Sequence, residues 1–144
     1  WIPEEIGYPK VYRMLKPGGA FARFANHPNR DPNRPEMHEA LQEVYAVYMP
    51  GTRNDKIYGE EEARERAEAA ARYGFVDIQY KLYHRVRTFT AAEYVQLVST
   101  YSDHVALEEE KRKRFFAEIR QVIERLGGEI SIYDTLDLQL ARRP

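Results

Sequence analysis

Two long segments of the sequence alternate apolar and polar residues, and they limit the possible folds more than any other feature. The first segment covers residues 75–89, with apolar side chains at Val76, Ile78, Tyr80, Leu82 and Val86. The second covers residues 129–142, with apolar side chains at Ile130, Ile132, Leu136, Leu138 and Leu140. A period of two predicts strands that turn these residues toward a core. We expect the two strands to pair in antiparallel fashion, with residues 90–127 as a helical insertion between them.

Helical spacing of apolar residues and turn signals divide the rest of the chain. They predict helices at 3–15, 36–49, 60–73, 90–102 and 108–126. Thr90 and Glu93 have the spacing of a capping box, which marks the start of the fourth helix. The apolar run AFARFA at 20–25 predicts a short buried strand. The prolines and polar residues of 26–35 predict that a loop follows this strand directly.

Composition excludes several classes of protein. The absence of cysteine excludes disulfides and thiolate metal sites, and it is typical of a cytoplasmic protein. A net charge of −1 argues against binding to nucleic acid or to an anionic membrane. The sequence contains no apolar run of transmembrane length, so no membrane association is expected. His38 and His84 have no partner at ligand spacing, and we expect no metal site.

Two turn motifs resemble a known family. MLKPGGAFARF at 14–24 resembles the segment that enters the fifth strand of class I S-adenosylmethionine-dependent methyltransferases, in the small-molecule type of that family. RYGFVDIQ at 72–79 resembles the turn before their sixth strand, and residues 127–142 are similar to a seventh strand. The resemblance implies an α/β fold, namely the C-terminal half of a Rossmann-like sheet, strands five to seven, with an inserted helical cap.

The resemblance covers only the second half of the family fold. The sequence has no G-x-G turn after a strand, which is where family members hold the cofactor. It therefore implies that residues 1–144 are the C-terminal part of a methyltransferase domain, and that the cofactor-binding half precedes them. S-adenosylmethionine would be bound mainly by that missing half, with Trp1 as the expected contact in this chain. The chain alone is then expected to be inactive.

Four residues are candidates for contact with a small-molecule methyl acceptor. Asn26 and His27 follow the strand at 20–25, where ligands of open α/β sheets bind. The alternative is that they cap a turn before Pro28. Tyr101 and His104 lie between two helices of the insertion, where they could cover the substrate.

The segment around Tyr101 and His104 has a second interpretation. Ser102 or Asp103 could simply cap the helix that follows, as short polar side chains often do. Both interpretations can hold at once. Neither the methyl acceptor nor the atom that is methylated can be identified from the sequence.

Two other functions remain open. The chain could be a catalytically silent module that binds a partner or forms a homo-oligomer, since an uncovered strand at 20–25 would readily recruit another strand. It could also be a self-contained α+β domain, if its three strands form an antiparallel sheet without a gap. In the fragment interpretation we expect a dimer that forms through residues 20–25 and the first helix, or an exchange of elements between two chains.

Overall fold

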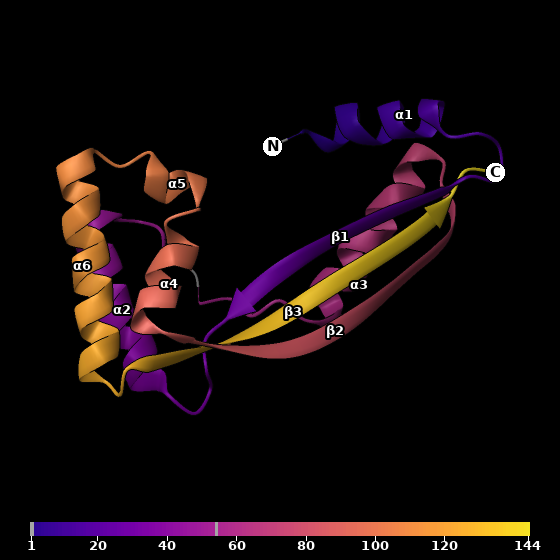
Figure 1. The fold of residues 1–144 in the computed structure, drawn as a ribbon. Helices are drawn as coiled ribbons and strands as arrows, with labels where there is room; N and C mark the ends of the chain where they lie inside the picture. Colours follow the sequence, from indigo (N-terminus) through magenta and orange to yellow (C-terminus); the bar gives the residue numbers. More distant parts are fainter. Residues whose placement is uncertain (1, 54) are drawn as a thin grey trace. The chain divides into compact units, whose positions relative to one another are not determined.

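The computed structural model describes residues 2–53 and 55–144. Figure 1 shows the order of the elements along the chain. The helices are α1 (Glu4–Met14), α2 (Pro35–Tyr48), α3 (Glu60–Glu68), η1 (Ala69–Tyr73), α4 (Ala91–Val98), α5 (Ser102–Val105) and α6 (Glu109–Arg125). The strands are β1 (Ala20–Asn29), β2 (Val76–Thr90) and β3 (Glu129–Arg142). The predicted elements are all present; the helix expected at 60–73 ends in a 3₁₀ turn, and the one expected at 90–102 ends at Val98.

The three strands form one sheet in the order β1-β3-β2. Figure 1 shows β3 running opposite to both neighbours. Side chains mark the register between β2 and β3: the Thr88 and Ser131 hydroxyl oxygens lie 2.9 Å apart, and His84 Nδ1 lies 3.3 Å from Thr135 Oγ1. The predicted antiparallel pairing of residues 75–88 with 129–141 is confirmed.

Strand β1 is longer than the sequence predicts. It continues through Asn26, His27 and Pro28 to Asn29, in place of the loop expected from residue 26. Proline is tolerated because β1 lies at the edge of the sheet, where a strand can lack one backbone donor. The polar residues are accommodated because β3 offers carboxylates to them, as described below. Asn26 and His27 therefore lie within a strand and not beyond its end.

The chain divides into two compact units. We call the first the strand unit; it comprises the residues up to Pro28, Ile57–Arg85 and Asp134–Pro144. We call the second the helix unit; it comprises Asn29–Lys56 and Val86–Tyr133. The expected insertion at 90–127 lies in the helix unit together with α2, which precedes it in sequence by some forty residues.

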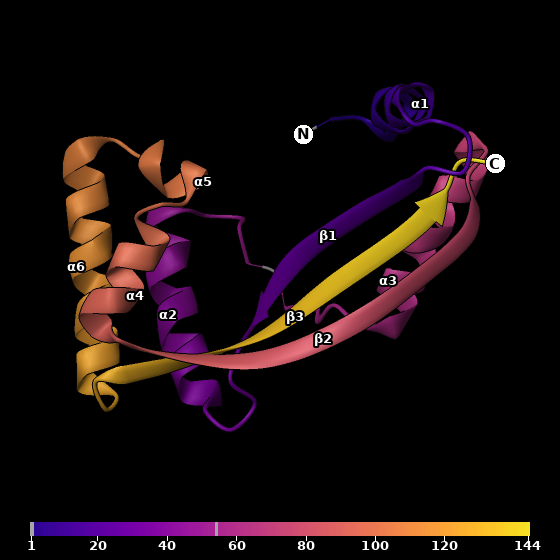
Figure 2. The same cartoon turned by 45° about the vertical axis from the view of Figure 1, so that its right-hand side comes forward.

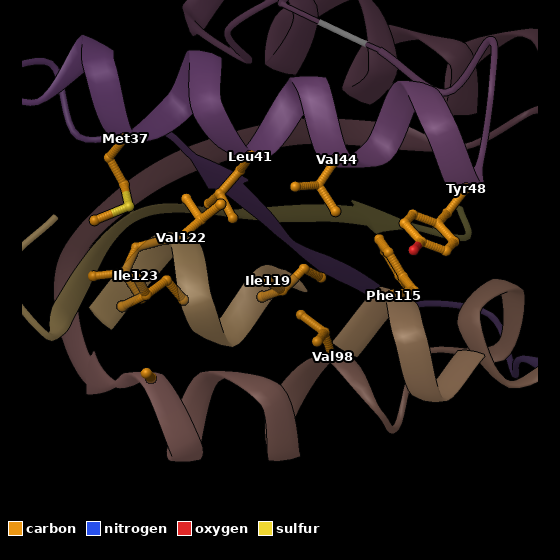
Figure 3. Packing of buried hydrophobic residues seen from close by; sticks show 11 residues of the cluster. Met37, Leu41, Val44, Tyr48, Val98, Phe115, Ile119, Val122 and Ile123 are labelled. Atoms are coloured by element: carbon orange, nitrogen blue, oxygen red, sulfur yellow. The ribbon is translucent and has the colours of Figure 1, made fainter. Parts of the chain in front are cut away.

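The helix unit has a core of apolar residues from α2, α4 and α6 (Figure 3). Its fully buried side chains on α6 are Phe115, Ile119 and Ile123, which recur at four-residue intervals. Val98 of α4 is also fully buried against them. The cap that starts α4 has the predicted form, because Thr90 Oγ1 accepts from the Glu93 backbone N–H and Glu93 Oε2 accepts from the Thr90 backbone N–H.

The strand unit has a smaller core, in which Tyr8 of α1, Ala69 and Ala70 of η1, Phe75 and Ala141 are buried together. Figure 2 shows α1 and the α3–η1 segment beside the sheet. Gly74 ends η1 with φ +87°, a left-handed conformation that favours glycine. The turn that precedes β2 is therefore specified by this residue.

The prediction that Leu136, Leu138 and Leu140 face the core is wrong in the strand unit. Leu136 and Leu138 are only half-buried, and Leu140 is 38% exposed. Apart from Asp134, the buried residues of β3 in this unit are those of the opposite side: Thr135, Asp137, Gln139 and Ala141. Helix α1 and the 3₁₀ turn η1 contribute their apolar residues to the cluster that holds Ala141, so the buried side is the one they cover. The alternation of apolar and polar residues predicts that β3 has two different sides, but it does not determine which side other elements cover.

Candidate functional site

A buried carboxylate lies at the centre of a polar cluster in the strand unit. The Asp137 side chain is 1% exposed. Its Oδ2 atom accepts a hydrogen bond of 2.6 Å from the Tyr58 hydroxyl and one of 2.7 Å from Gln139 Nε2. Gln139 stands two residues further along the same side of β3, while Tyr58 comes from the segment before α3. Both donors reach Oδ2 and stabilise the ionised carboxylate, whereas Oδ1 accepts no hydrogen bond from the described residues.

His27 contacts the other oxygen of this carboxylate. Its Nε2 atom lies 3.5 Å from Asp137 Oδ1. Its ring is stacked on the ring of Tyr58, with centroids 3.6 Å apart and planes inclined by 3°. The His27 side chain is 22% exposed, so it lies between the buried carboxylate and solvent. Stacking on Tyr58 thus orients the plane of the His27 ring, and its Nε2 edge faces Asp137 Oδ1 without a hydrogen bond between the two atoms.

Two guanidinium groups complete the cluster. Arg66 Nε of α3 lies 3.9 Å from Asp137 Oδ2. Arg23 Nε donates to Gln139 Oε1 over 2.9 Å, and Arg23 Nη2 donates to the backbone carbonyl of Arg66 over 3.2 Å. Arg23 and His27 lie four residues apart on β1, so the pleat turns both toward the covered side of the sheet.

The environment changes two pKa values in this cluster. Burial acts to raise the pKa of the Asp137 carboxyl, but the Tyr58 hydrogen bond and the charges of Arg66 and His27 outweigh it and lower the pKa below its ordinary value. Burial raises the pKa of Tyr58 to about 12, and the Asp137 carboxylate adds to this effect. Asp137 is therefore ionised at neutral pH, and Tyr58 keeps its proton and donates it.

Asn26 and His27 are neighbours in sequence but lie on opposite sides of β1. Asn26 Nδ2 donates to Asp134 Oδ1 over 3.0 Å, and Arg85 Nε donates to Asp134 Oδ2 over 3.0 Å. Asp134 is thus a second buried carboxylate, on the side of β3 that faces away from Asp137. The structure does not bring Asn26 and His27 to one site.

Tyr101 and His104 lie in the helix unit. His104 is 2% exposed, and its Nδ1 atom lies 2.8 Å from the backbone carbonyl oxygen of Val98. Its ring contacts those of Tyr45, Tyr101 and Phe115. Tyr101 is 36% exposed. A contact of either residue with a substrate stays a prediction, and the cofactor contact expected of Trp1 lies outside the described residues.

Ser102 and Asp103 do not cap the long helix that follows them. Glu108 precedes α6 and accepts hydrogen bonds from the backbone N–H groups of Glu110 and Lys111. Asp103 Oδ1 instead accepts from the backbone N–H of His104 over 3.0 Å. The capping interpretation of this segment is wrong for α6.

The sequence does not predict the other residues of this cluster, namely Asp137, Tyr58, Gln139, Arg66 and Arg23. The sequence does contain a signal for Asp137. Aspartate is depleted inside strands, and β3 carries Asp134 and Asp137 within an otherwise regular strand pattern. Carboxylates in such positions need donors from neighbouring strands or helices, which marks them as parts of a polar network.

The cavity beside the cluster is too small for S-adenosylmethionine. This cavity, lined by Tyr8, Phe21, Arg23 and Gln139 among others, has room for about one water molecule. Residues 2–53 and 55–144 contain no group of three or more His, Asp or Glu side chains that could hold a metal ion.

None of the helices in those ranges is both long and apolar enough to cross a membrane.

Comparisons with known proteins give matches among solved structures. No protein-family model and no curated protein matches the sequence. A protein of Bacillus halodurans, solved as a candidate methyltransferase, is 16% identical with a TM-score of 0.41; the match covers 95% of this chain and 61% of that one. Phosphoethanolamine N-methyltransferase 2 of Haemonchus contortus was solved with phosphomonomethylethanolamine and S-adenosylhomocysteine, and also with S-adenosyl-L-methionine. These two structures are 16% and 15% identical with TM-scores of 0.31.

The chain spans less than two thirds of each of these proteins. It covers 61% of the bacterial chain and 29% of each nematode chain. All three are named methyltransferases, the family that the turn motifs resemble. At these identities and TM-scores the similarity is partial, and it does not make the chain a member of that family.

Proposed function

We propose that this chain is the substrate-side part of an S-adenosylmethionine-dependent methyltransferase that acts on a small molecule in the cytoplasm. The strand order carries the proposal. The resemblance makes β1 a fifth strand and β3 a seventh, which should be neighbours, and β1 does lie beside β3. The Pro-Gly-Gly turn leads into β1, and the Gly74 turn leads into β2, as the motifs imply.

The chain contributes substrate contacts in this proposal, and residues outside it hold most of the cofactor. S-adenosylmethionine supplies the methyl group, and Trp1 is its proposed contact in this chain. Asn26, His27, Tyr101 and His104 are each proposed as a contact of the methyl acceptor in the complete protein. Asn26 and His27 face opposite sides of β1, so one acceptor molecule contacts only one of these two. Transfer of a methyl group depends mainly on alignment of the reactants, which can lower the barrier by roughly 7–11 kcal/mol.

The geometry gives His27 the clearest role among these four. Its side chain is 22% exposed, its ring is stacked on Tyr58, and a buried carboxylate lies 3.5 Å from its Nε2 atom. A side chain held in this way can orient an acceptor or take a proton from it. His104 is enclosed by aromatic rings and directed at a backbone carbonyl, so its contact with a substrate requires the helix unit to open locally.

A methyl-transfer assay tests the proposal. The protein encoded by the complete reading frame that contains residues 1–144 is incubated with S-adenosylmethionine labelled in the methyl group and a panel of small hydroxylated and amino compounds. We expect label in one of the small molecules, and a large loss of that label in His27→Ala. Label found only in protein or nucleic acid, or no transfer at all, would contradict the proposal.

A second candidate is a module that binds a partner or a second copy of itself. The side of the sheet that bears Asp134 also carries Phe24, which is 80% exposed, Tyr83 at 45% and Leu140 at 38%. Apolar residues grouped in this way are typical of interaction surfaces. Strand β1 is also an edge strand of the described sheet, because β3 is its only neighbour there. An edge strand can recruit a strand from another chain.

The self-contained α+β domain is also supported by one observation. The three strands are adjacent and antiparallel without a gap, which is the condition that this interpretation sets. The methyl-transfer assay separates it from the first proposal, because a self-contained domain of another class has no reason to transfer the label.

A further inference from the structure

Three tyrosine side chains of the helix unit gather around His104. Tyr45 comes from α2, Tyr94 comes from α4, and Tyr101 directly precedes α5. The ring centroids of Tyr45 and Tyr101 lie 5.6 Å and 5.3 Å from the ring centroid of His104. The Tyr94 hydroxyl is close enough to both other hydroxyls to interact with them electrostatically. We call Tyr45, Tyr94 and Tyr101 the tyrosine cluster.

The tyrosine cluster extends from the surface into the unit. Tyr101 is 36% exposed, and Asp103 is exposed as well. Tyr45 and Tyr94 are half-buried, and both pack against the core of the helix unit. His104 is buried and supports the rings from the inside. A ligand that approaches from solvent therefore meets Tyr101 and Asp103 first.

The charge of the cluster favours a cation. The groups that act on the Tyr45 hydroxyl are the Tyr94 and Tyr101 hydroxyls and the Asp103 carboxyl, and none of these groups is basic. Burial raises the pKa of Tyr45 and of Tyr94, so both phenols stay protonated and neutral at pH 7. Asp103 thus contributes a negative charge beside neutral rings.

Arg112 of α6 also reaches α5, but it is directed at the backbone. Its Nη1 atom donates to the carbonyl oxygen of Val105 over 2.7 Å and to that of Leu107 over 3.4 Å. Arg112 is not among the groups that act on the Tyr45 hydroxyl. The faces of aromatic rings attract cations, and the attraction grows where water is excluded. The half-buried rings and the carboxylate therefore act in the same direction.

We propose that the tyrosine cluster, with Asp103 at its exposed side, binds the alkylammonium group of a small organic molecule. The rings contact the carbon atoms attached to the nitrogen, and the Asp103 carboxylate supplies the opposite charge. If this molecule is the methyl acceptor, the acceptor belongs to the organic ammonium compounds; that step rests on the proposed function. The binding site itself does not depend on methyl transfer.

Tetramethylammonium and tert-butanol test the preference for charge, because they have nearly the same size and only the first is charged. Each is titrated into the 144-residue chain, which contains every residue of the proposed site, and the signals of carbon-13-labelled tyrosine rings are followed by NMR. We expect tetramethylammonium to shift the signals of the tyrosine cluster saturably at millimolar concentration, with an affinity about tenfold above that of tert-butanol. Tyr83, which is 45% exposed in the strand unit, is the internal reference and should not respond. Equal affinities, or the absence of a saturable shift, would overturn the proposal.

Asp103→Asn separates the charge from the shape of the site. The amide oxygen can still accept the hydrogen bond that the His104 backbone N–H donates to Asp103 Oδ1. We expect the affinity for tetramethylammonium to fall about fivefold, the size expected of one exposed charge pair. Glu43→Gln is the matched control, because Glu43 is exposed on α2 and is not among the groups that act on the Tyr45 hydroxyl. An equal loss in both variants would refute the assignment of Asp103.

Tyr101→Leu tests the contribution of the ring. Tyr101 is 36% exposed, so its replacement leaves the core of the unit in place. We expect the affinity to fall about two- to fivefold, as for one exposed cation–π contact, and Tyr83→Leu to have no effect. An unchanged affinity in folded Tyr101→Leu would count against the site. Should this variant fail to fold, the comparison of tetramethylammonium with tert-butanol on the wild-type chain still decides.

The failure of this inference can be told apart from the failure of the proposed function. The titration needs no cofactor, so cation binding without methyl transfer keeps the site and refutes the proposed function. Methyl transfer to an uncharged molecule, without cation binding, keeps the proposed function and refutes the site.

Discussion

Replacement of Asp137 by alanine removes the acceptor on which the polar cluster depends. The Tyr58 hydroxyl and Gln139 amide lose their partner, and Arg66 loses its nearest carboxylate in the cluster. A hydrogen bond to a charged group contributes about 1.5–3 kcal/mol, and removal of one member of a buried ion pair costs about 3–5 kcal/mol. The contributions overlap, so we expect Asp137→Ala to lower the free energy of unfolding by about 3–5 kcal/mol.

Two milder variants divide this loss. Asp137→Asn keeps an oxygen for both donors and removes the charge, which should cost about 2 kcal/mol, since two charge-assisted bonds become neutral ones. Tyr58→Phe removes one of the two donors and should cost about 1–3 kcal/mol. Tyr80→Phe is the matched control, because Tyr80 is 36% exposed in the same unit and its change should stay within about 0.5 kcal/mol.

Urea unfolding followed by circular dichroism at pH 7 measures these differences. The loss in Asp137→Ala should shrink on acidification. The pKa of Asp137 is lower in the folded protein than its ordinary value, so its contribution is complete above the unfolded pKa of about 3.9 and is lost as the pH falls through the lower, folded pKa. If Asp137→Ala costs no more than Tyr80→Phe, or if its cost does not change below about pH 4, the ionised cluster is not part of the folded state.

Three further predictions concern stability and association. Phe115 is fully buried, so Phe115→Ala should lower the free energy of unfolding by about 3–5 kcal/mol, and by more than Phe116→Ala does, as measured by urea unfolding. Thr90→Ala removes the cap of α4 and should cost about 0.5–2 kcal/mol in the same assay; no loss would mean that the cap is dispensable. The chain should dimerise at micromolar concentration through residues 20–25, and Phe24→Asp should weaken the dimer in sedimentation; a wild-type monomer would contradict this.

The sequence predicts most of the local structure because its signals are local. The period of α6 identifies the buried positions Phe115, Ile119 and Ile123, and each is fully buried. Thr90 and Glu93 predict the cap of α4 from two residues three positions apart. Gly74 predicts the end of η1 because a left-handed residue is needed there. In each case the residues that decide the outcome are close together in the chain.

Sequence analysis fails where the outcome depends on distant partners. The length of β1 depends on Asp134 and Asp137, which lie more than one hundred residues away and accommodate Asn26 and His27. The buried side of β3 depends on α1 and η1, and nothing in β3 itself shows where those elements pack. Asp137 is buried because it lies on this covered side of β3.

The candidate site could be predicted only in part. The place of His27 after an apolar strand predicts that it is a site residue. Its carboxylate and its stacked tyrosine come from segments that follow it by 110 and 31 positions, so no motif could join them. Asn26, which shares the same sequence motif, lies on the other side of the strand because side chains alternate.

Calorimetric titration with S-adenosylmethionine tests the central claim most directly. The protein encoded by the complete reading frame and the 144-residue chain are titrated under the same conditions. We predict that the complete protein binds the cofactor with a dissociation constant in the micromolar range, and that the chain alone gives no measurable heat. Binding by the chain alone would place the cofactor site within residues 1–144, and no binding by the complete protein would contradict its assignment as a methyltransferase.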